Sequence, residues 1–568
     1  MITIRNSKEE QRMMRRAFAK YIIPTIIALL FGQVAPIVDS LCISDALGEY
    51  ALSAISTINP VYYFFNIIAV LGGVGGGVGI AKASGSGEKE KGGRIFTKTI
   101  VTITAASLVL SVLCLIFIEP LLVFLSVTPE NHGYAREYLT VLLAGMVFYV
   151  LNFSLTYILT DDNNPNLAMA GGIVAGIVNI IIDYAGIYVF KKGIWVTAFG
   201  TVFGMFVSCL VFLLHLRKKD RICRIVLRKD VKRDVPLKEI ISPGAPGGFQ
   251  YILFTVQFLL INRLLSSYMG TSGLGNATIV ENIELIGTIF TSGVGEAVLP
   301  LFASYYGEEN YGGLKLVKRS ALVLGQIVML PLVLFLFLRP ECLITLFSIE
   351  DPLMIKTLPS AIRITVITLY IIMTNSILTS CLQSTGEEKK ASFSVILLAV
   401  VQITFTVLLS GIYPENAPWL AALIGNLCVF AYFVIFCKQL SNMGLHSADN
   451  ICMITSGYSV KEEIEGFFNA AKEFIAEKDA RLLWSSLFEP FLSAVRDGRK
   501  LPCSFLVLEK DNGGHSVILR YDSPKSIIEN DSMVEADAED KEETEGLYNQ
   551  CIRSEFNFVQ RLMINFRQ

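Results

Sequence analysis

The sequence predicts an all-α membrane protein, with twelve transmembrane helices in two six-helix lobes related by internal duplication, and a small α+β cytoplasmic domain after them. Three observations lead to this prediction. Of the 568 residues, 53% are hydrophobic and only 17% are charged, with a mean hydropathy of +0.54, unlike an ordinary soluble domain. Apolar runs of about 20 residues, long enough to cross a bilayer, recur over residues 18–438. A repeated segment divides these runs into two halves.

The repeat is a segment that occurs twice at an offset of 220 residues. Ala83–Gly93 aligns with Ala303–Gly313, and six of the eleven positions are identical. Both copies end a long apolar run. A second match at a similar offset pairs Asn152, Leu155, Thr156, Leu159 and Ala168 with Asn375, Leu378, Thr379, Leu382 and Ala391. Duplicated membrane bundles of this kind usually face each other across a cavity near the bilayer midplane and move a substrate by rocking.

The twelve expected spans follow one another with short connections. They lie roughly at residues 18–43, 51–80, 95–117, 136–159, 166–190, 194–216, 238–266, 276–303, 318–347, 357–384, 390–411 and 417–438. We therefore expect a first lobe at residues 1–217, a basic connector at 218–236, a second lobe at 237–440 and a soluble domain at 458–568.

The charges of the loops predict the orientation. Lys and Arg gather before the first span, after the second span and between the halves, where the segment from Arg217 to Arg233 carries nine of them. The opposite loops at 44–50, 268–275 and 412–416 carry none; Lys191 and Lys192 are the exception. Because cationic loops stay in the cytoplasm, we expect a multi-pass protein of the bacterial cytoplasmic membrane with both termini in the cytoplasm.

Other function classes have little support in the sequence. The basic connector is better explained by contact with anionic membrane lipids than by nucleic acid. The eleven cysteines show no CxxC spacing, and the four histidines are isolated in the sequence, so neither a zinc site, a disulfide framework nor a histidine catalytic pair is indicated. We expect a protein that is not an enzyme, holds no cofactor and acts as a monomer.

Ionisable side chains within the spans are the first place to look for function, because each is costly in the bilayer unless it faces a cavity or a partner. The first span contains Asp39. In the fifth span Asn179 and Asp183 are four residues apart and share a helix face, and Thr201 lies in the sixth. These oxygens could enclose Na⁺ or, as two close carboxyls, bind and release a proton. The alternative is that both aspartates lie at the outer ends of their spans in water.

Prolines and glycines mark the first two spans. Pro24 and Pro36 remove backbone hydrogen bonds from the first span and are expected to interrupt and bend it; a static kink is the alternative. The glycine-rich stretch 72–79 has no Gly-Lys-Ser/Thr after it and no strand before it, so a nucleotide-binding loop is not indicated. Close helix packing explains these glycines better.

A second set of polar residues could line a substrate cavity. Glu281 and Glu284 are one helical turn apart and could attract a cationic substrate, although they could equally lie solvated at the outer mouth of their span. The full set of expected cavity residues is Gln33, Gln250, Gln257, Glu281, Glu284 and Asn375.

These features together resemble the multidrug and toxic compound extrusion (MATE) transporters over about residues 15–440. The resemblance lies in Ile23-Pro24 with Ile37-Val38-Asp39, in Ala81-Lys82-Ala83-Ser84-Gly85-Ser86-Gly87, in the loop Asp161–Met169, in Asn179–Tyr184 and in Gly193–Ala198. It implies two six-helix lobes in a V shape and antiport of a drug against H⁺ or Na⁺.

The resemblance also implies a cation site. In the DinF-like branch of that family, the aspartate of the first span and the Asn-x-x-x-Asp motif of the fifth span form it. By position these are Asp39, Asn179 and Asp183, with Thr201 beside them. The acids that the Na⁺-coupled branch uses in the second lobe have no clear counterpart here, so the first-lobe site is expected to couple the ion to transport.

The tail has the composition of a soluble domain. Helices are expected at Val460–Glu477, Arg481–Arg496 and 546–562, and paired strands at Ser504–Leu508 and Ser516–Tyr521; an acidic stretch covers 529–545. The tail resembles, distantly, the histidine-kinase-like ATPase fold of anti-sigma-factor kinases, with Glu489 and Asp522 at two expected positions. Ser493 and Ser523-Pro524 depart from that pattern, so the binding of a ligand or a protein partner is expected rather than ATP turnover.

The expected function is therefore secondary active efflux of organic, often cationic, compounds in exchange for H⁺ or Na⁺ by alternating access. One alternative is a flippase for a lipid-linked oligosaccharide, built on a related two-lobe architecture; a cationic groove is expected there, and the spans hold few cations. The other alternative is a membrane sensor that signals through the tail.

Overall fold

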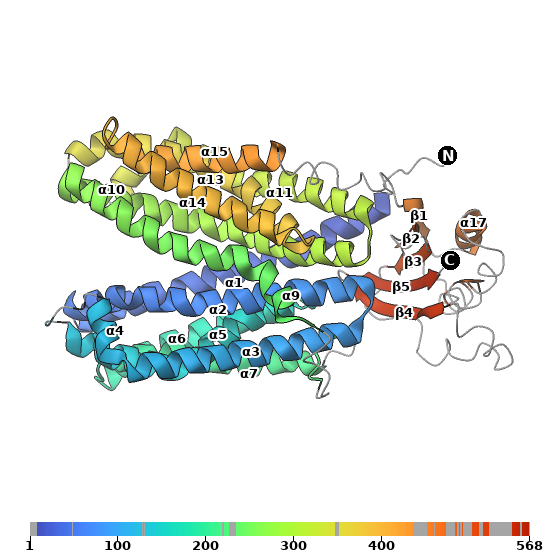
Figure 1. Cartoon of the computed structure of the whole chain (residues 1–568), viewed down its shortest axis with the longest axis horizontal. Helices are drawn as coiled ribbons and strands as arrows, with labels where there is room; N and C mark the ends of the chain where they lie inside the picture. Colours follow the sequence, from blue (N-terminus) through green and yellow to red (C-terminus); the bar gives the residue numbers. More distant parts are fainter. Residues whose placement is uncertain are drawn as a thin grey trace.

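The computed structural model is drawn whole in Figure 1. It describes residues 8–47, 49–125, 127, 129, 131–217, 221–226, 235–346 and 352–435 of the membrane part. In the tail it describes 451–458, 461–472, 483, 484, 488, 491, 502–509, 515–521, 548–556 and 559–566. The membrane part is helical and forms two lobes, and the tail forms a sheet at one end of them, which we call the tail-side end.

The first lobe contains six long helices and several short helical elements. Its core lies where α1, α2, α5 and α7 meet, around Phe65, Leu142 and Met146, which are fully buried. The elements are α1 (Lys8–Leu47), α2 (Glu49–Ser86), α3 (Lys89–Ile116), α4 (Ile118–Phe124), α5 (His132–Asp161), α6 (Pro165–Tyr184), η1 (Ala185–Val189), α7 (Trp195–Phe212) and η2 (Leu213–Arg217).

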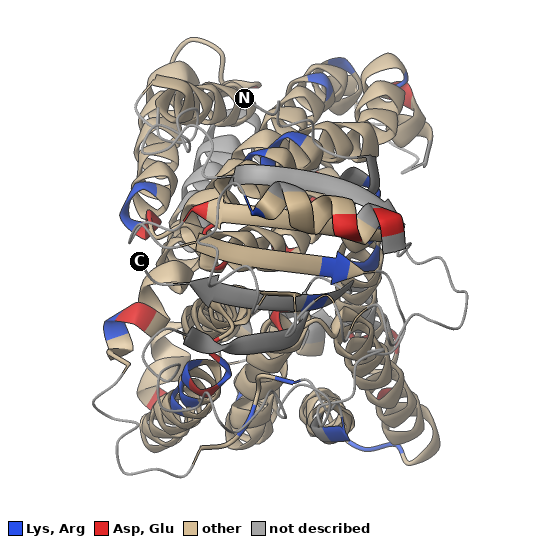
Figure 2. Ribbon diagram, turned by 90° about the vertical axis from the view of Figure 1, so that its right-hand side faces the viewer, with Lys and Arg blue, Asp and Glu red and all other residues tan. Residues whose placement is uncertain are grey.

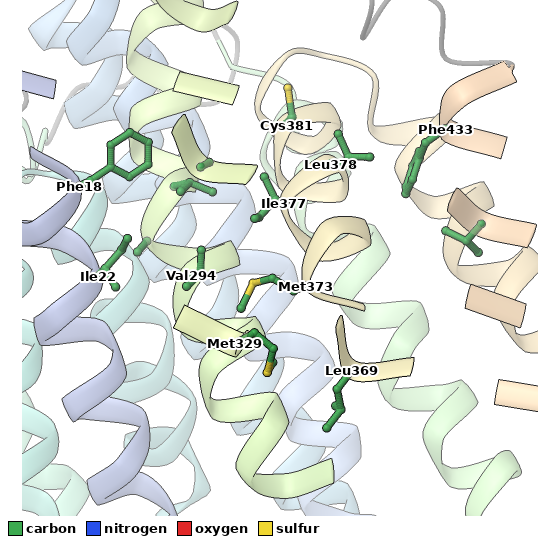
Figure 3. Packing of buried hydrophobic residues seen from close by; sticks show 14 of the residues in the cluster. Phe18, Ile22, Val294, Met329, Leu369, Met373, Ile377, Leu378, Cys381 and Phe433 are labelled. Carbon is green, nitrogen blue, oxygen red and sulfur yellow. The ribbon is translucent and has the colours of Figure 1, made fainter. Parts of the chain in front are cut away.

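The second lobe repeats this plan. Its core (Figure 3) is built around Phe302, Met373 and Ile377. A single helical element, α10, contains the predicted seventh and eighth spans. The elements are α9 (Leu237–Ile241), η3 (Ser242–Gly244), α10 (Ala245–Gly307), α11 (Tyr311–Leu338), α12 (Glu341–Leu346), α13 (Pro352–Ser384), α14 (Glu388–Ser410) and α15 (Ala417–Ile435).

The helices confirm the predicted membrane class. Among the described residues, ten helical segments are long and apolar enough to cross a bilayer. The remaining two predicted spans, the first and the seventh, lie in α1 and in the first part of α10. The fold is that of a twelve-helix membrane protein.

Equivalent hydrogen bonds in the two lobes confirm the duplication. Thr156 Oγ1 donates to the carbonyl of Asn152 at 2.9 Å, and Thr379 Oγ1 donates to the carbonyl of Asn375 at 2.8 Å. The two asparagine amides then bond to the last helix of their own lobe. Asn152 donates to Ser208 of α7, and Asn375 donates to the backbone of Asn426 of α15.

Helix α1 belongs to both lobes. Near its start, Phe18 and Ile22 pack into the core of the second lobe beside Val294 of α10 (Figure 3). Near its end, Cys42 and Ile43 pack into the core of the first lobe. Pro24 and Pro36, at which bends are expected, lie between these contacts. The helix continues through Pro24 and Pro36 rather than ending at either, and the bend expected at these prolines stays a prediction.

The two lobes touch closely at the tail-side end. Side chains of α2 and α10, including Val74, Val78 and Leu299, form one buried cluster there. Just beyond it the repeated segments meet backbone to backbone: a Cβ at Gly85 would overlap the carbonyl oxygen of Ser304, and one at Gly307 would overlap that of Lys82. The lobes are therefore closed against each other at this end, and only glycine permits the approach.

The tail forms a five-stranded antiparallel sheet in the order β1-β2-β3-β5-β4. The predicted strand pair is confirmed, with Leu506 of β2 opposite Ile518 of β3. The elements are β1 (Ile451–Tyr458), α17 (Lys461–Ala471), β2 (Pro502–Glu509), β3 (His515–Tyr521), β4 (Tyr548–Phe556) and β5 (Val559–Phe566).

Of the predictions for the tail, one is wrong and another is not confirmed. The helix expected at 546–562 is wrong, because this segment forms β4 and part of β5. Pairing with β3 decides the outcome, since β5 completes the ladder along the whole edge of that strand. The kinase-like resemblance is not confirmed: Glu489, Ser493, Asp522 and the acidic stretch lie outside the described residues.

Candidate functional site

Four predicted polar residues come together inside the first lobe. Asn179 Nδ2 of α6 donates to Asp183 Oδ2 at 3.3 Å and to Thr201 Oγ1 of α7 at 3.4 Å. The carboxyl group of Asp39, on α1, is a neighbour of these three side chains and interacts with each of them. We call Asp39, Asn179, Asp183 and Thr201 the acid–amide cluster.

A glycine allows the cluster to form. At Gly200 of α7, a Cβ atom would lie 2.5 Å from Asp183 Oδ1 and 3.3 Å from Asn179 Nδ2. Gly204, one turn further, lets α7 approach the backbone of α6 at Ala175. The close packing of α6 and α7 therefore places the Asp183 carboxyl against the backbone of its neighbour.

Burial decides against a solvated position for the cluster. Asp183 is 0% exposed and Asn179 is 4% exposed, while Asp39 is partly buried. Within the described part of the chain, three buried oxygens of the cluster accept no hydrogen bond: Asp39 Oδ1, Asn179 Oδ1 and Asp183 Oδ1. Such acceptors are costly unless a cation or a proton meets them.

The chemistry of this donor set fits a small cation. Two carboxylates that are close together and away from water repel one another, so binding one positive charge relieves both the repulsion and the burial cost. Carboxylate, amide and hydroxyl oxygens suit a hard cation such as Na⁺. A proton fits equally, because a carboxyl can hydrogen-bond to a second carboxyl only when one of them carries a proton.

Comparison with known proteins assigns the family. The MatE family model matches residues 24–185 and again 246–408, more than half of the chain and once in each lobe. The chain belongs to the MatE family. The multidrug export protein MepA of Staphylococcus haemolyticus (strain JCSC1435) is 22% identical over 429 residues, which cover 75% of this chain and 94% of that protein.

Solved structures show the same fold in the membrane part. A crystal structure of MATE in the bent conformation has a TM-score of 0.70 and 23% identity, and it covers 78% of this chain and 100% of that one. A multidrug resistance MATE family transporter in an outward-facing conformation has a TM-score of 0.69 and 24% identity, with 78% and 99% covered. The MatE fold of the two lobes is thus shown.

The other candidate residues of this MatE protein are more dispersed. Glu281 and Glu284 of α10 are partly buried, and Gln250 is exposed. The side chains of Gln33 and Gln257 lie outside the described residues. Asn375 is 6% exposed and bonds to α15 within its own lobe, which gives it a packing role; its expected role toward substrate stays a prediction.

Sequence reasoning did not single out a polar contact between the lobes. Tyr157 of α5 donates its hydroxyl to Glu296 Oε1 of α10 at 2.8 Å. Both residues are in apolar spans, and Glu296 is an intramembrane acid that sequence alone could have flagged. Its partner is 139 positions away, so only the packing of the lobes identifies the pair.

His215 is not isolated in space. Its Nε2 lies 2.7 Å from Asp162 Oδ2, and the backbone amides of Ile222 and Cys223 donate to the same carboxylate at 3.1 Å. Asp162, His215 and Cys223 place potential metal ligands within 4.8 Å of one another. The carboxylate is already occupied by these donors, which indicates a structural network that fixes the start of the connector to the first lobe.

Proposed function

We propose that this MatE protein is a secondary active multidrug efflux transporter, which exchanges H⁺ for organic compounds by alternating access. The observation that carries the proposal is the acid–amide cluster, whose three buried oxygens accept no hydrogen bond within the described residues. The family relative named a multidrug export protein supports the substrate class. We expect a monomer with no cofactor and no enzymatic activity.

We propose H⁺ as the coupling ion because the cluster contains two neighbouring carboxyl groups, Asp39 and Asp183, which interact with each other. Two buried carboxylates that are both ionised repel one another, and one bound proton relieves that repulsion. Na⁺ stays the alternative that a gradient experiment separates.

Helix α1 links the cluster to the opposite lobe. Asp39 is in the half of α1 that packs in the first lobe, whereas Phe18 and Ile22 are in the core of the second. Pro24 and Pro36 lie between these contacts and each removes one bond from the helix ladder. Protonation of the cluster that changes the packing of α1 would thus shift the lobes relative to each other and release substrate.

The proposed orientation places the tail-side end in the cytoplasm. The basic segment after α2 lies at this end, and the described connector residues Arg224 and Val226 pack against it at Gly93, which agrees with the positive-inside rule. Because the lobes are closed there, the structure corresponds to a state that is closed toward the cytoplasm. Substrate and proton would exchange with the outside in this state.

The test is efflux of an organic cation from membrane vesicles under an imposed proton or sodium gradient. Asp39→Asn and Asp183→Asn are expected to abolish gradient-driven efflux, because each removes a group that must gain and lose charge. The matched control is Asp45→Asn on the same helix, since Asp45 is exposed and bonds only to Tyr188 in the described contacts.

Three results would count against the proposal. Unchanged coupling in both cluster variants would refute the site, and dependence on sodium alone would refute H⁺. A parent protein without gradient-driven efflux of small organic compounds would leave the flippase or the sensor as the better reading.

A further inference from the structure

The tail sheet covers the tail-side end of both lobes. Figure 2 looks onto this end and shows the strands crossing in front of the helix ends. At the centre of the sheet, Arg520 of β3 is directly opposite Arg561 of β5. Both side chains are almost completely buried, at 1% and 0% exposure, which is rare for arginine.

The two arginines contact both lobes at once. Arg561 Nη1 donates to Glu308 Oε1, at the end of α10, at 3.0 Å and to the carbonyl of Gly85 at 2.9 Å. Its Nη2 donates to the carbonyl of Ser84 at 2.8 Å. Arg520 Nη2 bonds to the other oxygen of Glu308, and its guanidinium lies 5.3 Å from the ring centre of Tyr305.

The buried charges connect the sheet to the tail-side end of the lobes. Two like charges directly opposite on neighbouring strands repel each other, and burial lowers the pKa of the Arg561 guanidinium while Glu308 opposes that effect. The Glu308 carboxylate, itself 0% exposed, is the anion that both arginines meet. Removing the Glu308 carboxylate would leave both arginines buried without this anion, so its loss should destabilise the docked position.

The contact sits on the closed junction between the lobes. Gly85 touches Ser304, and Arg561 binds the first-lobe side of this contact through two carbonyls and the second-lobe side through Glu308. In the duplicated segment of the first lobe, Glu88 occupies the position of Glu308, yet its side chain is 55% exposed and lies near Lys91 at 3.4 Å. In the described contacts, the first copy therefore offers the tail backbone carbonyls, and the second copy offers it a carboxylate.

From these contacts we propose that the tail is a clamp that holds the lobes closed at the tail-side end and must leave before they open there. The proposal rests on the alternating access proposed above. The relative MepA matches 75% of this chain but 94% of its own length, so the tail is an addition to the transporter. It would make transport dependent on whatever releases the sheet.

The first experiment measures docking in the full-length chain. A protease site is introduced between α15 and β1, the chain is cleaved in isolated membranes, and the fraction of tail that sediments with the membranes is measured. We expect retention in the parent and loss of retention in Glu308→Gln and in Arg520→Gln/Arg561→Gln. Glu308→Gln leaves the tail sequence intact, so loss there cannot come from an unfolded sheet.

The matched control is Glu90→Gln. Glu90 lies two residues after Glu88 in the first lobe, and its side chain is 79% exposed. The tail of the Glu90→Gln variant should stay with the membranes. Retention in all variants would show that the arginine contacts do not hold the tail, and would overturn the proposal.

The second experiment measures closure and transport with the uncleaved chain. Ala81 is 1% exposed in the cluster between the lobes, and Ala81→Cys reports opening through its reaction with an impermeant maleimide added from the cytoplasmic side. The labelling rate of each protein that lacks the Ala81→Cys substitution is subtracted, to correct for the native cysteines. In Glu308→Gln we expect labelling about ten-fold faster, as breaking a buried charge contact shifts the equilibrium, and faster efflux.

Release of the tail with unchanged labelling would make it a passive appendage and overturn the clamp. Failure of the proposed function has a different signature, namely a parent without gradient-driven efflux. Docking and labelling need no transport and remain readable in that case.

Discussion

Asp183 is the acid that the surrounding residues constrain most. It is fully buried, it accepts a hydrogen bond from Asn179, and Gly200 leaves room for its second oxygen. A side chain held so tightly can respond to a proton without large motion of its own. The response must then pass to Asp39 on α1, the one member of the cluster that belongs to a helix shared by both lobes.

Gly200→Ala tests the importance of that space. The added Cβ would lie 2.5 Å from Asp183 Oδ1, so the carboxyl must move from its position in the cluster, and we expect at least about a ten-fold loss of proton-driven efflux. Proton-gradient-driven efflux in vesicles is the measurement. Gly133→Ala is the matched control, because no atom lies within 4 Å of a Cβ there; equal activity of the two variants would contradict the geometry of the cluster.

At the scale of elements, a hydrogen bond joins α5 of the first lobe to α10 of the second. Tyr157 on α5 donates to Glu296 on α10, close to the apolar cluster of α2 and α10. The alternating access proposed above would break this bond when the lobes separate at the tail-side end. The bond therefore contributes to the balance between the two states rather than to the stability of either lobe.

Tyr157→Phe should weaken closure at the tail-side end. Losing a hydrogen bond worth about 1 kcal/mol shifts a two-state balance about five-fold, which the labelling rate of Ala81→Cys measures. Tyr149→Phe provides the control, because Tyr149 donates to Asn66 within the first lobe at 2.9 Å. If the control raised labelling as much as Tyr157→Phe, the contact between the lobes would not be responsible.

At the scale of the whole molecule, the sequence predicts whatever depends on local pattern or on duplication. Apolar runs located the spans, and the spacing of Asn179 and Asp183 placed both on one helix face. The strand pair around Leu506 and Ile518 followed from its apolar pattern and an intervening Gly-Gly turn. Each of these features is encoded within a short stretch of chain.

Contacts between distant segments could not be predicted in this way. Arg520 and Arg561 look like ordinary surface arginines until β3 and β5 pair and place them over Glu308, 212 and 253 positions away. The helix expected at residues 546–562 is wrong for the same reason, because pairing of β5 with β3 and of β4 with β5 forms strands there. His215 likewise gains its partner Asp162 only through folding.

The acid–amide cluster and the arginine contact of the tail would influence the same conformational change from two different sites. The acid–amide cluster would respond to the proton, while the arginine contact of the tail would set how readily the lobes separate on the tail side. The cluster reaches the second lobe through α1, which packs in both lobes, and the arginine contact lies at the ends of α2 and α10, which pack against each other. Proton binding and substrate binding must then be linked, and each must weaken the other by the same factor.

Proton release on substrate binding tests this linkage most directly. An organic cation is added to the purified full-length protein in weakly buffered detergent solution, and the change in pH is recorded. The account predicts protons released by the parent and by Asp45→Asn, and none released by Asp183→Asn. Equal release by the parent and Asp183→Asn would contradict it.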